Sequence, residues 1–257
     1  MSLQPFRSAF PWRRRRGVIA LLFAILYCAP LPISAQTKEM EHELGMMTWG
    51  RALYVLFDVL EYSPSLPDRL ARAEMLSWYG GSRKRVWLLA EAEQNTKGNQ
   101  DGEAELQVLY GRLVDPFWDA VAGVRLERDW SGSGQERAFL VLGLIGLTPY
   151  RFELQPAVFV SSKGEVSARL EASYQILVTQ RLIAEPEIEV NAALQRVAES
   201  EIRQGLNDYD LQFRLRYELR REFAPYIGWS RLRKFGDGSP GVANAQTRFV
   251  IGLRLWR

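Results

Sequence analysis

The chain has 257 residues, of which 47% are hydrophobic and 25% are charged, a composition too apolar for a disordered protein. Its net charge of +3 depends on the first 35 residues, which hold five arginines and no acidic residue. Without them, 28 basic residues stand against 30 acidic ones, so bulk charge gives no reason to expect a nucleic-acid partner.

Residues 1–35 have the three parts of a secretory signal peptide. Arg13–Arg16 form a charged region, an apolar run follows over Val18–Ala29, and Ser34-Ala35 offers small residues for cleavage. Twelve apolar residues in a helix reach about 18 Å, which is short of a hydrocarbon core of about 30 Å. The length therefore favours a cleaved signal over a membrane anchor. Cleavage would also remove Cys28, the one cysteine.

Residues 36–50 are interpreted as a short linker before the first predicted strand. Its candidate metal ligands are Met40, His42, Met46 and Met47, and His42 is the one histidine of the chain. Thioether sulfur suits Cu(I), and imidazole suits both copper states, so these side chains predict a site for one copper ion. The alternative is an ordinary linker without a metal site, because four candidate ligands are few for a copper site.

Residues 51–257 alternate apolar and polar side chains with a period of two, which indicates half-buried strands. The clearest runs are 164–179, 208–221 and 248–256, and clusters of Gly, Asn, Ser and Pro separate the runs. We expect about twelve strands of roughly 10 to 14 residues, longer than those of a typical soluble sandwich. The pattern predicts an all-β fold, an antiparallel transmembrane β-barrel with a polar lumen, because only a closed sheet satisfies every backbone group in lipid.

Alternation alone does not exclude a soluble exported β-sandwich or lipocalin-like barrel, in which the apolar set would face inward. Aromatic residues near the predicted strand ends favour the membrane barrel, because such barrels carry aromatic girdles at both interfaces. These girdle candidates are Trp78, Tyr79, Trp87, Phe117, Trp118, Tyr150, Tyr226, Trp229 and Trp256.

Two sets of charged residues are expected to line the lumen. Glu185, Glu187 and Glu189 share one face of a predicted strand. Arg214, Arg216 and Arg220 share one face of a later strand. Together they predict either a cation path or docking site, or a plug of Glu–Arg salt bridges that closes a narrow barrel. The plug is favoured, because opposite charges that face one another normally pair.

Nine sequence strings follow one another through about 200 residues of the mature part. They are Phe57–Tyr62 (FDVLEY), Trp78–Gly81 (WYGG), Arg85–Leu88 (RVWL), Leu109–Arg112 (LYGR), Phe117–Asp119 (FWD), Gly146–Tyr150 (GLTPY), Ala168–Glu171 (ARLE), Thr179–Leu182 (TQRL) and Arg214–Gly228 (RLRYELRREFAPYIG). In this order the chain resembles the copper-resistance protein B family, exported outer-membrane proteins of copper-resistance operons. Members typically carry a longer Met- and His-rich segment before the barrel, which is reduced here to residues 36–50.

The resemblance implies an outer-membrane protein of copper resistance that binds copper or lets it cross the membrane. The partners it implies are copper ions, outer-membrane lipid and a periplasmic copper-binding protein. The alternative is a closed or structural outer-membrane barrel without metal specificity. We expect no enzyme, because residues 51–257 contain no histidine base and no cysteine nucleophile.

Overall fold

A computed structural model describes residues 51–64, 69–97, 101–130, 136–196, 204–235 and 245–257. These residues form thirteen strands and one 3-10 turn, η1. The elements are β1 (Ala52–Ser63), β2 (Leu70–Gly80), β3 (Lys84–Asn95), β4 (Gly102–Asp115), β5 (Trp118–Asp129), β6 (Glu136–Leu147), η1 (Pro149–Arg151), β7 (Phe152–Ser161), β8 (Val166–Tyr174), β9 (Ile176–Leu177), β10 (Leu182–Ala193), β11 (Gly205–Tyr217), β12 (Phe223–Lys234) and β13 (Ala245–Trp256). Among the described residues, no helix is long and apolar enough to cross a membrane.

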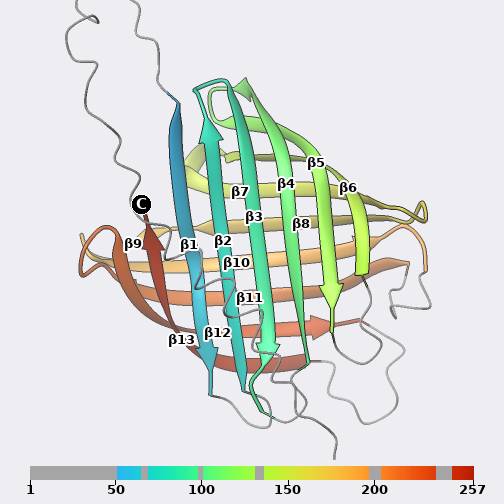
Figure 1. The fold of residues 1–257 in the computed structure, drawn as a ribbon. Helices are drawn as coiled ribbons and strands as arrows, with labels where there is room; N and C mark the ends of the chain where they lie inside the picture. The colour runs from blue at the N-terminus through green and yellow to red at the C-terminus, as the bar shows by residue number, and fades with distance from the viewer. Residues whose placement is uncertain (1–50, 65–68, 98–100, 131–135, 197–203, 236–244) are drawn as a thin grey trace, which may run out of the picture. The chain divides into compact units, whose positions relative to one another are not determined.

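The strands form one sheet that closes on itself. Each strand pairs antiparallel with its neighbour along the chain, β13 pairs with β1, and β10 pairs with β11 (Figure 1). The two-residue strand β9 follows β8 after Gln175, and both pair with β10, so they are two parts of one interrupted strand. The described residues therefore form a closed antiparallel barrel of twelve strands, and the predicted fold class is confirmed.

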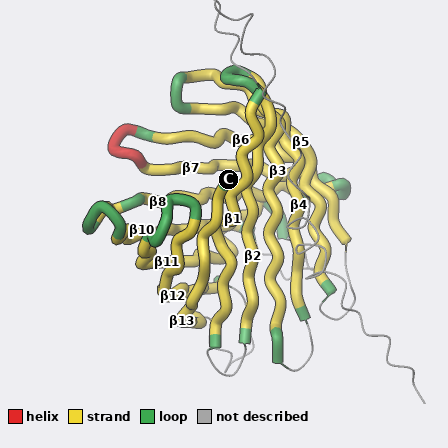
Figure 2. The backbone as a smooth tube through the Cα atoms, turned by 60° about the vertical axis from the view of Figure 1, so that its left-hand side comes forward, coloured by secondary structure: helices red, strands yellow, loops and turns green. Residues whose placement is uncertain are grey.

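The two ends of the barrel differ in their connections (Figure 2). The connections β2–β3, β4–β5, β6–β7, β9–β10 and β11–β12 lie at one end, which we call the turn end. The connections β1–β2, β3–β4, β5–β6, β7–β8, β10–β11 and β12–β13 lie at the other, the loop end. Arg257 is hydrogen-bonded to Val55 at the turn end. In outer-membrane barrels the short turns face the periplasm and the longer loops face outward.

The polar set of strands such as β11 faces inward. On β11, Gln212, Arg214 and Arg216 are buried, whereas Leu140 and Leu142 on β6 are 63% and 62% exposed on the outer face. This is the reverse of a soluble barrel, which hides its apolar set. The predicted polar lumen is therefore present, and the apolar face of the sheet is free to meet lipid.

Four inward-facing aromatic rings lie near the turn end of the lumen. The rings of Trp256, Tyr54, Trp78 and Trp87 follow one another across β13, β1, β2 and β3, with centroid separations of 6.2, 6.1 and 6.4 Å. Trp87 is also part of a buried cluster with Leu109, Val121, Phe139, Val141 and Phe159.

The girdle prediction was therefore wrong for several aromatic residues. Trp78, Trp87 and Trp256 lie on the inward set of their strands, and Tyr226 is only 5% exposed. Tyr79, Phe117, Tyr150 and Trp229 are exposed, as the prediction required. Nearness to a strand end did not reveal the face of the sheet, because a shift by one residue moves a side chain to the other face.

Candidate functional site in the barrel lumen

The predicted lumen charges lie together on two neighbouring strands. Strand β10 pairs with β11 so that Glu185 is opposite Arg214 and Glu187 is opposite Gln212. Arg216 binds Glu185 at 2.6 Å, and Arg214 binds Glu187, so the favoured prediction of Glu–Arg pairing is confirmed for these residues. Arg220 was wrongly assigned to this set: it is an exposed residue of the β11–β12 turn.

The copper ligands predicted in the linker, Met40, His42, Met46 and Met47, lie outside the described residues. The copper site of residues 36–50 therefore stays a prediction.

Carboxylates stand in rows across neighbouring strands of the lumen wall. One row runs from β2 to β5, with each residue directly opposite the next: Glu74, Glu91, Glu105 and Glu127. A second row, on the opposite wall, runs over β8, β10 and β11: Glu171, Glu189 and Asp210. Like charges directly opposite one another destabilise a sheet, so these rows require positive charge in the lumen.

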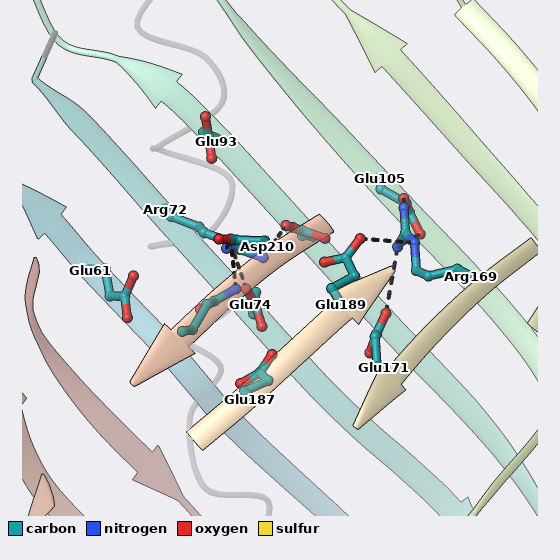
Figure 3. A network of polar contacts seen from close by, with 12 residues as sticks. Glu61, Arg72, Glu74, Glu93, Glu105, Arg169, Glu171, Glu187, Glu189 and Asp210 are labelled. Carbon is teal, nitrogen blue, oxygen red and sulfur yellow. Dashed lines mark hydrogen bonds and ion pairs between the residues drawn. The ribbon is translucent and has the colours of Figure 1, made fainter. Parts of the chain in front are cut away.

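Three arginines supply that charge and reach across the lumen, and Figure 3 labels two of them, Arg72 and Arg169. Arg72 of β2 lies 2.6 Å from Glu74 and 2.8 Å from Glu91, and it reaches Asp210 of β11 at 3.7 Å. Arg169 of β8 lies 3.2 Å from Glu105 of β4 and 3.3 Å from Glu189.

Arg214 of β11 lies 2.8 Å from Glu61 of β1. Because none of the pairs Arg72–Asp210, Arg169–Glu105 and Arg214–Glu61 joins adjacent strands, we call the three arginines crossbars.

Between the crossbars lies a cavity of about 130 Å³. Its acidic lining residues are Asp58, Glu74, Glu91, Glu105, Glu153, Glu171, Glu187 and Glu189, and its basic ones are Arg72, Arg169 and Arg254. Arg125 and Arg214 also pair with two of the eight carboxylates, Glu105 and Glu187. The remaining excess of carboxylates leaves a negative potential, which attracts cations and repels anions.

The lumen does not present a chelating site. No group of three or more His, Cys, Asp or Glu side chains within the described ranges is arranged to hold a metal ion.

Arg125 lies between the acidic cavity and the apolar cluster. Its guanidinium lies 5.2 Å from the ring centroid of Phe139 and 4.6 Å from that of Phe159, and it binds Glu105 at 2.7 Å. The acidic and the aromatic parts of the lumen thus meet at Arg125.

Sequence reasoning missed most of this site. Arg72, Glu91 and Glu105 occupy alternate positions of strands whose alternation is less regular than that of β11, whereas Arg169 lies on the polar face of the clear run 164–179. A signal was present, because Glu91 and Glu93, like Glu103 and Glu105, recur with a period of two and so share the inner face.

Comparisons with known proteins agree with this architecture. The family model described as "Copper resistance protein B precursor (CopB)" matches residues 51–257. "Copper resistance protein B" of Escherichia coli is 39% identical over 207 residues, which cover 79% of this chain and 68% of that protein. A "Copper resistance protein B homolog" of Pseudomonas syringae pv. tomato is 33% identical over 208 residues, which cover 79% of this chain and 69% of that protein.

Among solved structures, the NanC porin superposes with a TM-score of 0.52. The alignment covers 79% of this chain and 99% of the porin, at 15% sequence identity. At this identity the likeness concerns the fold alone, a porin-like outer-membrane β-barrel.

Proposed function

The chain belongs to the copper resistance protein B family, which supports a role in copper resistance, and we propose that it is an outer-membrane barrel whose lumen lets copper cations pass. The outer-membrane location is supported by the exposed apolar face of the barrel and by the signal-like residues 1–35. The word "precursor" in the family description agrees with a signal that is removed.

The observation that carries the proposal is the acidic cavity between the crossbars. Its carboxylate excess favours cations, and the described residues hold no chelating cluster that would retain one. Carboxylates select for charge and not for copper, because hard oxygen ligands do not prefer Cu(I). We assign the preference for copper to Met40, His42, Met46 and Met47 of the linker, whose sulfur and imidazole ligands suit it.

The test is copper entry into vesicles that contain the folded protein. Glu153 and Glu171 line the cavity. Among the described residues, Glu171 forms one ion pair, with Arg169 at 3.7 Å, and Glu153 forms none within 4.0 Å. We expect Glu153→Gln with Glu171→Gln to lower copper flux severalfold and to reduce the cation preference measured as a reversal potential. Glu136→Gln is the matched control, because Glu136 pairs with Arg128 and both are highly exposed. Equal flux in the lumen variant and the control would contradict the proposal.

A second candidate is a closed barrel without metal specificity. The crossbars favour it, because they join opposite walls within the lumen. It predicts that the wild-type protein passes no more copper than empty vesicles do.

Neither candidate includes an enzymatic step, and residues 51–257 contain no histidine for general-base catalysis. A periplasmic copper-binding protein would meet transported copper at the turn end, and this partner stays part of the proposal.

A further inference from the structure

Charge appears on the outer face of β12 only near the loop end. The outward-facing residues of this strand are, in order, Ile227, Trp229, Arg231 and Arg233. Ile227 is 61% exposed and Trp229 is 37% exposed, and both arginines are exposed. An apolar residue, an aromatic residue and then basic residues follow the change from hydrocarbon through the interface to the headgroups.

The neighbouring strands place no carboxylate beside these arginines. Arg231 lies between Leu211 of β11 and Thr247 of β13, and Arg233 lies between Tyr209 and Ala245. The surroundings are instead aromatic. The Arg233 guanidinium lies 5.3 Å from the ring centroid of Phe235, and that ring lies 5.7 Å from the ring of Tyr209.

A comparison on the same end of the barrel shows that this charge is not balanced by a carboxylate among the described residues. Arg128 of β5 is also exposed near the loop end, but it pairs with Glu136 of β6 at 3.4 Å. That pair neutralises itself. Arg231 and Arg233 instead present two positive charges on the surface that meets the membrane interface.

We propose that Arg231 and Arg233 bind the phosphate groups of lipopolysaccharide in the outer leaflet. Guanidinium groups form bidentate, charge-assisted hydrogen bonds with phosphate oxygens. The two arginines lie two residues apart on one face of a strand, a separation of about 7 Å, so both can reach one headgroup. The inference rests on the outer-membrane location proposed above, and it does not depend on copper passage.

The test measures binding of lipid A to the folded protein in detergent, by native mass spectrometry and by titration. Wild-type protein is compared with Arg231→Gln/Arg233→Gln, with Arg231→Lys/Arg233→Lys and with the matched control Arg128→Gln. The probes are bisphosphorylated lipid A, chemically dephosphorylated lipid A and inorganic phosphate. Heat-modifiable gel migration checks that each variant is folded.

We expect the Gln variant to bind bisphosphorylated lipid A about tenfold more weakly or worse, because it loses charged hydrogen bonds. The control should stay within about twofold of wild type, because its arginine is an exposed, already paired residue. The Lys variant keeps both positive charges and should keep part of the affinity. That result would show that the Gln variant binds weakly because of lost charge and not because of misfolding.

Two results would overturn the assignment. If the protein binds dephosphorylated lipid A as tightly as bisphosphorylated lipid A, the phosphate groups do not contribute, and the acyl chains account for the binding. Inorganic phosphate bound as tightly as the lipid would assign the site to a free anion. Copper flux of the Gln variant is expected to equal that of wild type, so failure of this inference is distinct from failure of the proposed transport.

Discussion

Arg214 on β11 and Glu61 on β1 form an ion pair of 2.8 Å, although 153 residues separate them in the sequence. Strands β12 and β13 lie between them in the sheet, and the two side chains are only 5% and 6% exposed. Arg214 also binds Glu187 and Gln212. Arg214 therefore connects β10 and β11 with β1, the strand that closes the barrel by pairing with β13.

Removing this crossbar should strongly destabilise the barrel. In Arg214→Met, the buried carboxylates of Glu61 and Glu187 lose their cation, and we expect the free energy of unfolding to fall by about 3 to 5 kcal/mol. Urea unfolding of the protein in lipid vesicles measures this loss. The control, Arg128→Met, breaks an exposed pair and should cost less than about 1 kcal/mol. A double variant, Arg214→Met with Glu61→Gln, should be more stable than Arg214→Met alone, because it no longer buries the unpaired carboxylate of Glu61. Equal stability of the two variants would argue against an interaction between Arg214 and Glu61.

The other two crossbars should control the passage of ions. Arg72→Gln with Arg169→Gln removes two of the three positive charges of the cavity lining and leaves its carboxylates in place. We expect higher single-channel conductance and a stronger cation preference in planar bilayers, because both a barrier and a competing cation are lost. Arg128→Gln on the outer face should change neither quantity. If the crossbar variant conducts like wild type, the barrier to ions lies elsewhere, for instance at the aromatic rings near the turn end.

A glycine on β4 should be required for the packing of an inward-facing tryptophan. A Cβ atom at Gly111 would lie 2.5 Å from Nε1 of Trp87, a member of the buried cluster. We expect Gly111→Ala to lower the free energy of unfolding by about 1 to 3 kcal/mol through overpacking. Gly81→Ala is the matched control, since nothing lies within 4 Å of a Cβ atom there. If both variants unfold at the same urea concentration, the Trp87 ring moves to make room for the added methyl group without a loss of stability.

The linker should decide whether copper is bound before it is passed. We expect the mature protein to bind one Cu(I) ion, and deletion of residues 36–50 should abolish that binding, because Met40, His42, Met46 and Met47 are then lost. A competition titration with a colorimetric Cu(I) chelator measures it. Binding that survives the deletion would move the site into the lumen, and no binding by either protein would leave only passage or a closed barrel.

The sequence by itself determined the fold class of this protein. A period of two over about twelve long segments, together with turn residues between them, was enough to predict a closed antiparallel barrel, because the backbone in lipid permits few other solutions. The strings listed from Phe57 to Gly228 were enough to indicate the family. That glutamates of one strand pair with arginines of the other followed from the charges that the two strands carry, although the individual partners did not.

Only the tertiary structure decided which aromatic residues face the lumen and which residues meet across it. Alternation divides the residues of a strand into two sets, but it does not say which set meets lipid, so Trp78 and Trp87 were misplaced. The crossbar contacts Arg72–Asp210 and Arg169–Glu105 depend on the tilt and stagger with which the sheet closes, and these are properties of all strands together. No short stretch of sequence contains that information, because each contact joins strands that are not neighbours in the sheet.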